Sequence, residues 1–196
     1  LYKKGNSVWK PIVLEADGYY TANDFDSNGK LNANLPQPRF GRVAPGDIKY
    51  KDYNNDQVVD ENDAHPIGNS TVPAWNYMFS GGFKYKGFDF SVMFQGVAQR
   101  DIYLRGANIY SFQNNGTASN LALDSWTPTH TDASYPRLST MNFSNNYRTS
   151  TFWRRNGSFL RLRNVQVGYE LANSVTRALR LSSVYFYVNA TNLFTL

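Results

Sequence analysis

The chain has 196 residues, a formal net charge of +5 and no cysteine, and 16% of its residues are aromatic. The lack of cysteine excludes disulfide bonds, thiolate metal sites and cysteine nucleophiles. The sequence has no run of eighteen apolar residues and no nucleic-acid-binding motif among its scattered basic residues, so we expect neither a transmembrane helix nor nucleic-acid binding. A signal-peptide pattern is also lacking, and any export signal is expected outside this chain.

Residues 1–74 are predicted to form a long, irregular loop region, because they are rich in Asn and Pro. Within it, residues 52–63 carry oxygen donors at positions one, three, five, seven, nine and twelve of a twelve-residue segment. Ca²⁺ prefers six to eight hard oxygen ligands at such a spacing. The pattern predicts a structural calcium site, with these ligands: Asp52, Asn54, Asp56, the carbonyl of Val58, Asp60 and Asp63.

Two positions depart from the usual calcium loop, since Gln57 replaces the glycine of position six and Asp63 is shorter than the usual glutamate. The alternative is a structural turn held by hydrogen bonds, because Asp and Asn also bond their own backbone in turns. Prolines on both sides exclude the flanking helices of an EF-hand. Residues 24–35 show a weaker form of the same spacing. Their twelfth position is Leu35, which has no carboxylate, so we expect this segment to be a turn.

Residues 75–96 are predicted to form a β-hairpin around the turn Lys86-Gly87, because apolar residues alternate with small or polar ones on both arms. One face is strongly aromatic. Each arm has about ten residues, which suits a tilted strand that crosses a bilayer. A soluble sandwich or barrel would require the same alternation.

Residues 97–157 are predicted to form a second long loop. Several of its aromatic side chains could stack on sugar rings or pack the loop itself: Trp126, Tyr135, Tyr147, Phe152 and Trp153. His65 and His130 lie in separate loops without the spacing of a metal site or a triad. No catalytic residue and no catalytic cofactor is predicted, and the chain is not expected to be an enzyme.

Residues 158–196 are predicted to hold two further strands, 158–171 and 184–196, joined by a short helical or irregular turn at 173–181. The apolar positions of the first strand change phase after Leu162, which predicts a β-bulge near Arg163 or Asn164. Arg161 and Arg163 are expected on the wet side of this strand. They could favour acidic substrate groups.

The long connections alternate with the short ones, as in outer-membrane barrels with short periplasmic turns and long external loops. This asymmetry places the 52–63 segment outside the cell. Four strands with open edges would leave backbone groups unsatisfied in a bilayer, so we expect an incomplete part of a larger barrel. The predicted fold class is all-β, with antiparallel strands forming the C-terminal part of a transmembrane β-barrel and with long external loops.

An ordered set of segments resembles the C-terminal part of SusC/RagA-type TonB-dependent outer-membrane transporters. The set covers roughly residues 45–196 and consists of PGDIKYKD at 45–52, PIGN at 66–69, FDFSVMFQG at 88–96, RDIY at 100–103, WTP at 126–128, YPR at 135–137, GSFLRLRN at 157–164, GY at 168–169 and NLF at 192–194. Taken in order, these segments are specific, although no single one would be.

This resemblance implies a barrel in the outer membrane of a Gram-negative bacterium, in contact with outer-membrane lipid and opened by the TonB complex through an N-terminal plug. It also implies a SusD-like surface lipoprotein as partner and import of oligosaccharides or peptides. The plug lies outside this chain, and the substrate-binding residues stay unknown. The alternative from another class is a soluble, secreted all-β binding module with a calcium-stabilised loop.

Overall fold

The computed structural model describes residues 4–5, 9–140 and 145–196. The parts of the predicted loop regions that fall on residues 1–3, 6–8 and 141–144 lie outside the described residues. The chain divides into two compact units: a loop unit made of residues 1–69 and 102–155, and a sheet unit made of residues 70–101 and 156–196. The helices in the described part of the chain lack the length and the apolar composition of a membrane-spanning helix.

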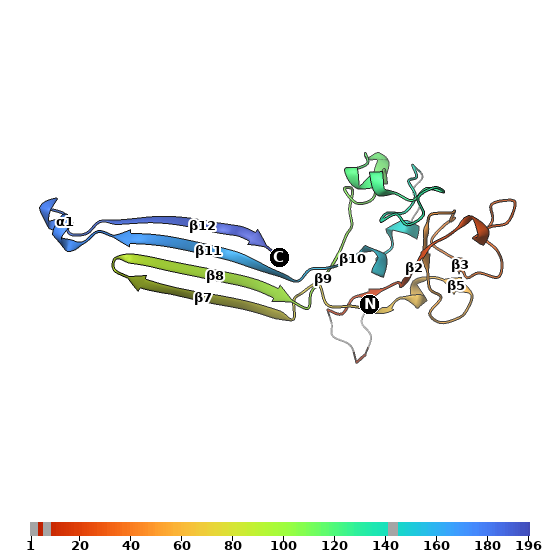
Figure 1. Cartoon of the computed structure of the whole chain (residues 1–196). Helices are drawn as coiled ribbons and strands as arrows, with labels where there is room; N and C mark the ends of the chain where they lie inside the picture. The colour runs from red at the N-terminus through yellow and green to blue at the C-terminus, as the bar shows by residue number, and fades with distance from the viewer. Residues whose placement is uncertain (1–3, 6–8, 141–144) are drawn as a thin grey trace. The chain divides into compact units, whose positions relative to one another are not determined.

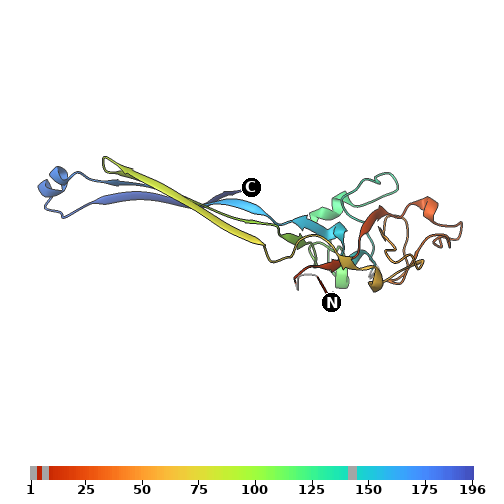
Figure 2. The same cartoon turned by 90° about the horizontal axis from the view of Figure 1, so that it is seen from below.

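The sheet unit is one antiparallel sheet of four long strands (Figures 1 and 2). In spatial order they are β12 (Tyr185–Thr195), β11 (Phe159–Glu170), β8 (Phe88–Ala98) and β7 (Trp75–Tyr85). The predicted hairpin and the two later strands are therefore confirmed. Lys86 and Gly87 join β7 to β8 with φ values of 47° and 84°, a turn whose twist suits paired strands. A short helix, α1 (Asn173–Ala178), stands in the connection from β11 to β12.

The predicted bulge is present in β11, where the register shifts between Leu162 and Asn164 against both neighbouring strands. Against β8, Arg163 is the extra residue, whereas against β12 the extra residue belongs to β12, where Asn192 and Leu193 lie opposite Arg163. The guanidinium of Arg163 donates to Oδ1 of Asn192 at 3.0 Å, and Asn192 has a φ of 53° in the neighbouring strand. The bulge restores the phase of the apolar positions, so that Leu162 and Val165 both lie on the same face of the sheet.

Directly paired residues share a face of a sheet, so the register defines two chemically different faces. We call one the apolar face; its larger side chains are Trp75, Tyr77, Phe79, Phe83, Tyr85, Phe88, Phe90, Val92, Phe94, Leu160, Leu162, Val165, Val167, Tyr169, Phe186, Val188 and Phe194. We call the other the polar face; its polar side chains include Lys84, Asp89, Ser91, Gln95, Arg161, Asn164, Gln166, Glu170, Tyr185, Asn189 and Thr191, and it also carries Met78, Met93, Val97, Phe159 and Tyr187. Arg161 thus lies on the polar side, as predicted.

The loop unit contains many short strands and 3-10 turns, which are joined by irregular segments. Its strands are β1 (Ile12–Val13), β2 (Ala16–Tyr19), β3 (Gln37–Pro38), β4 (Ile48–Tyr50), β5 (Val58–Val59) and β6 (His65–Pro66), with β9 (Asp101–Tyr103) and β10 (Arg154–Asn156) at the unit boundary. Its 3-10 turns are η1 (Ala22–Asp24), η2 (Glu61–Asp63), η3 (Gln113–Asn115), η4 (Asn120–Asp124), η5 (Asn145–Tyr147) and η6 (Thr151–Trp153). β1 pairs with β6 and β2 with β4, both antiparallel, β3 pairs with β5 in parallel, and β9 pairs with β10.

The loop unit has its own hydrophobic core, to which both long connections contribute. Leu14, Ile48 and Tyr50 come from the first stretch, and Tyr110 and Trp153 from the second. The two predicted loop stretches are therefore packed together around one core, an organisation that the sequence analysis did not predict. Sequence periodicity misses such a core because each element supplies only two or three residues to it.

Candidate functional site

The acidic segment 52–63 is closed by Asp63, a carboxylate that is only 1% exposed. One oxygen of Asp63, Oδ1, accepts the backbone N–H groups of Tyr53 at 2.8 Å and Asn54 at 3.3 Å. The other, Oδ2, accepts the N–H of Asp60 at 2.8 Å. Asp63 thus joins the two ends of the segment and satisfies three backbone donors.

Asp52, at the start of the segment, also binds backbone. Its two carboxylate oxygens accept the N–H groups of Asp56 at 3.2 Å and Gln57 at 2.8 Å. Gln57 has a φ of 64°, the left-handed conformation that glycine normally supplies at position six of a calcium loop. The backbone therefore turns as a calcium loop does, although the residue at the turn is not glycine.

The remaining predicted ligands hold short turns of their own. Oδ1 of Asp56 accepts the N–H of Val58 at 2.9 Å, Oδ1 of Asn54 accepts the N–H of Asp56 at 3.0 Å, and Oδ1 of Asp60 accepts the N–H of Asn62 at 2.7 Å. Across the described residues, no three His, Cys, Asp or Glu side chains are grouped so that they could hold a metal ion. The oxygen chemistry suits Ca²⁺, whereas the arrangement of the carboxylates is that of a hydrogen-bonded turn.

The segment at residues 45–50, which is part of the PGDIKYKD motif, carries three buried side chains of the loop unit: Asp47, Ile48 and Tyr50. Asp47 is fully buried and forms an ion pair with Arg137, from Nε to Oδ1 at 2.8 Å. Oδ1 of Asp47 also accepts from the side-chain amide of Asn146 at 2.8 Å. Asp47 therefore connects the first long stretch to two points of the second, and the charge is compensated inside the core.

The neighbouring Ile48 has both of its backbone groups bonded by the second stretch. Its N–H donates to Oδ1 of Asn146 at 2.9 Å, and its carbonyl accepts from Nδ2 of Asn145 at 2.8 Å. Tyr50 donates its hydroxyl to the carbonyl of Asn145 at 2.8 Å, and burial raises the pKa of this tyrosine. We call Asp47, Ile48, Arg137, Asn145 and Asn146 the loop hub. Sequence inspection missed it, because its members are about 90 to 99 residues apart.

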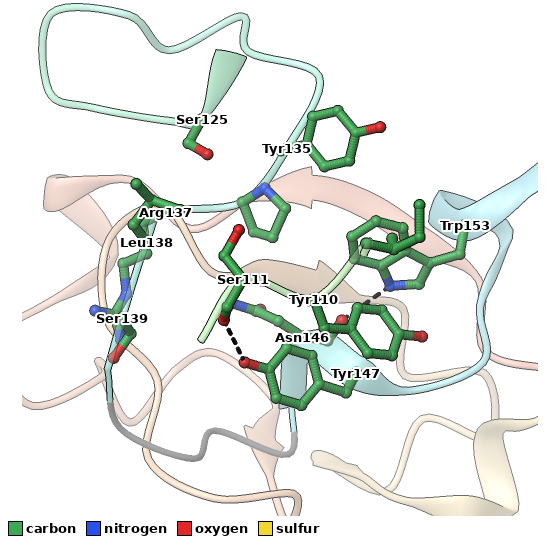
Figure 3. Close-up of a pocket in the computed structure, with 12 residues that line it drawn as sticks. Tyr110, Ser111, Ser125, Tyr135, Arg137, Leu138, Ser139, Asn146, Tyr147 and Trp153 are labelled. Carbon is green, nitrogen blue, oxygen red and sulfur yellow. Dashed lines mark hydrogen bonds between the residues drawn. The ribbon is translucent and has the colours of Figure 1, made fainter. Parts of the chain in front are cut away.

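A small hollow of about 30 Å³ lies beside the loop hub (Figure 3). Tyr110 stacks on Tyr147 with ring centroids 4.6 Å apart and meets Trp153 edge to face at 5.2 Å. Trp153 also donates its indole N–H to the carbonyl of Asn146 at 2.8 Å. Trp153 and Trp126 are 2% and 9% exposed, so these two indoles pack the loop unit and do not present a face to a sugar ring.

The two histidines lie in different surroundings. His65 stacks on Tyr53 with centroids 3.9 Å apart, and its Nδ1 lies 3.0 Å from the carbonyl oxygen of Asp63. His130 is exposed, with Nε2 at 2.9 Å from Asp124 and Nδ1 at 3.4 Å from Asp132. The hydrogen bond that the His130 ring donates to Asp124 raises the pKa of His130. Neither ring belongs to a metal-binding group within the described residues.

Comparisons with known proteins agree with this architecture. The TonB-dependent receptor P3 of Formosa agariphila is 28% identical over 198 residues, which is 100% of this chain and 18% of that protein. The RagAB peptide importer in its open-open state matches with a TM-score of 0.60 and 19% identity, covering 94% of this chain and 18% of the solved chain. Its closed-closed state matches with a TM-score of 0.58 and 20% identity, and this match covers 94% of this chain and 19% of the solved chain. A scan against protein-family models found no match.

The sheet, the loop unit and these matches define an all-β segment with the fold found in part of the RagAB importer. The predicted resemblance to SusC/RagA-type TonB-dependent transporters is confirmed by the curated relative and by the solved structures. The chain spans about a fifth of the length of these relatives.

Proposed function

We propose that this chain supplies four strands and an external loop unit to a TonB-dependent outer-membrane transporter, which imports oligosaccharides or peptides together with a SusD-like surface lipoprotein. The observation that carries this proposal is the uncovered apolar face of the sheet. Phe79, Phe83 and Phe186 expose 64%, 63% and 62% of their surface, and the described sheet unit has no second layer over them. A face of this kind favours contact with lipid over contact with water.

The connections of the sheet support the proposed orientation. Trp75 pairs with Ala98 and Phe159 with Val97, so both long stretches of the loop unit join the sheet at this end. The Lys86-Gly87 turn and the α1 connection lie at the opposite end. Short turns face the periplasm in outer-membrane barrels, so the loop unit is assigned to the cell surface, where a lipoprotein partner would meet it.

The strand order supports membership in a larger barrel. The four strands follow one another as β7, β8, β11 and β12, each antiparallel to the next, as in an up-and-down barrel. The outer edges of β7 and β12 have no partner within the described residues. In a barrel wall, both edges would pair with further strands of the same transporter.

The proposal is tested on the native protein in outer-membrane fractions. An antibody raised against residues 97–157 should detect a much larger, heat-modifiable band, and mild detergent should extract it together with a surface lipoprotein. A protein of about this chain's own size that stays monodisperse without detergent would overturn the proposal in favour of a soluble binding module. The substrate class is then separated by uptake of labelled oligosaccharides and peptides in a strain that lacks the gene.

Calcium binding by residues 52–63 is proposed as a structural stabilisation of the external loop unit. The left-handed φ of Gln57 and the six predicted oxygen donors support it, whereas the use of Asp63 by three backbone N–H groups favours a turn that is stable without metal. Calorimetric titration with Ca²⁺ of the wild-type protein, Asp56→Ala and Asp60→Ala separates the two. Binding heat that both variants lose supports a calcium site, and equal heats in all three proteins exclude one at these residues.

A further inference from the structure

Three cations lie in the two connections at the end of the sheet that is opposite to the loop connections. Lys86 lies in the turn between β7 and β8, and Arg177 and Arg180 lie in and just after α1; both connections are at this end (Figures 1 and 2). None of the three forms an ion pair with a described residue. The ammonium of Lys86 lies only over the ring of Tyr85, 5.2 Å from its centroid.

A row of aromatic side chains crosses the apolar face next to these cations. Tyr85 pairs with Phe88, Phe88 with Tyr169, and Tyr169 with Phe186, so that one aromatic residue from each strand lies at the same level. Tyr85 and Phe88 are mostly exposed. Such rows mark the level of the lipid headgroups on transmembrane barrels, which places the three cations at or just beyond that level.

The connection that carries the two arginines also exposes apolar side chains. Val175 and Leu179 are four residues apart, on one side of α1, and Leu181 follows; all three are exposed, whereas Thr176 is buried. An exposed apolar side chain beside a cation on a short segment is typical of an element that rests in the interface of a membrane. The two carboxylates near this end, Asp89 and Glu170, belong to the polar face, away from the aromatic row.

We propose that Lys86, Arg177 and Arg180 form a binding surface for the phosphate of an anionic phospholipid in the periplasmic leaflet, with the aromatic row and Val175 and Leu179 against its acyl chains. We call this the headgroup surface. The inference rests on the proposed function, since it requires the apolar face to lie in a bilayer. Charge complementarity selects the ligand, because three unpaired cations attract an anionic headgroup more strongly than a zwitterionic one.

The test uses the full-length protein, purified in mild detergent and incubated with equal amounts of phosphatidylglycerol and phosphatidylethanolamine, with bound lipid measured by native mass spectrometry. The wild-type protein should retain an excess of phosphatidylglycerol. Each cation near an anionic headgroup contributes about a fivefold preference at low ionic strength, so Lys86→Gln/Arg177→Gln/Arg180→Gln should reduce the excess at least ~10-fold.

The matched control is Lys30→Gln/Arg42→Gln/Arg105→Gln, which removes the same charge from exposed cations of the loop unit that form no ion pair with described residues. It should retain the excess of phosphatidylglycerol, as should Arg177→Lys/Arg180→Lys. Heat-modifiable migration shows that each variant has folded. Equal lipid excess in the wild type and both triple variants would overturn the headgroup surface, and so would complete loss of the excess on addition of millimolar inorganic phosphate. A protein that needs no detergent and retains no lipid would instead overturn the proposed function itself.

Discussion

Asp47 and Arg137 form a two-point ion pair across 90 residues of sequence, with Nε 2.8 Å from Oδ1 and a terminal nitrogen 3.1 Å from Oδ2. Asp47 is fully buried, and the side chain of Arg137 is 21% exposed. The pair fastens the segment that carries YPR to the segment that carries PGDIKY. This one ion pair therefore joins two of the segments that carry the resemblance described in the sequence analysis.

Asp47→Asn should destabilise the loop unit by about 3 kcal/mol, because it leaves the guanidinium of Arg137 in the core without its counter-charge. Amide hydrogen exchange at Ile48 and Tyr50 measures this loss locally. Arg39→Gln is the control: Arg39 is 71% exposed and lies 3.6 Å from Asp60, so its loss should cost less than about 1 kcal/mol. Equal exchange rates in the two variants would contradict the role of the loop hub.

Val167→Arg and Gln166→Arg place the same side chain on opposite faces of β11. Val167 pairs with Phe90 and Val188 on the apolar face, and Gln166 pairs with Ser91 and Asn189 on the polar face. If the apolar face meets lipid, Arg at 167 should cost about 2–4 kcal/mol and Arg at 166 much less. The fraction of heat-modifiable protein after refolding into detergent checks the difference, and similar yields for both variants would argue against a lipid-facing surface.

Gly168→Ala should weaken the polar face, because Tyr185 crosses β11 over this glycine. The hydroxyl of Tyr185 donates to Asp89 at 2.6 Å and accepts from Gln166 at 3.2 Å, and a Cβ at position 168 would collide with Tyr185 and Asp89. The expected loss is about 1–3 kcal/mol, measured as a lower temperature of the heat-modifiable transition. Gly81→Ala, where a Cβ has open space, should leave that temperature nearly unchanged.

The Asp124–His130 pair should give the loop unit a small pH dependence. The hydrogen bond that His130 donates to Asp124 raises the pKa of His130 above 6.5, so the contribution of His130 is complete below pH 6.5 and is lost as the pH rises through the raised value. Hydrogen bonds from Ser134 and then His130 lower the pKa of Asp124 below 3.8, so its contribution is present above that pH and is lost as the pH falls through the lowered value.

An NMR titration of the His130 ring checks this prediction. The wild-type midpoint should lie above 6.5, the ordinary value, and Asp124→Asn should bring it back toward that value. Asp132 also faces the ring, at 3.4 Å from Nδ1, so Asp132→Asn should lower the midpoint by less than Asp124→Asn does. An unchanged midpoint in Asp124→Asn would show that the pair does not form in solution.

Local chemistry made the sheet unit predictable from sequence. The alternation of Trp75 to Tyr85, the turn at Lys86-Gly87 and the phase change after Leu162 each act within a few residues, and the structure confirms all three. The loop hub could not be predicted in this way, because Asn145 and Asn146 bond Ile48 across 97 and 98 residues. The sequence around Asn145 and Asn146 does not indicate that Ile48 is their partner, and a pair of asparagines is also an ordinary turn sequence.

The acidic segment 52–63 could be predicted from the sequence only in part. Its donor spacing predicts an organised loop, and the structure shows the turn at Gln57 and the closure by Asp63. The spacing cannot tell whether the oxygens accept from backbone N–H groups or bind a cation, because both uses require the same residue types. Calcium binding therefore stays a prediction.

The shared core of the loop unit limits which parts of this chain can be exchanged with those of a relative. Asp47 and Ile48 depend on Arg137, Asn145 and Asn146 as bonding partners. A chimera that receives only one of the stretches 1–69 and 102–155 from a relative would therefore combine buried side chains that do not complement each other. Transplanting both stretches together should preserve the interior, so the pair is the natural unit for grafting a new surface onto the same four strands.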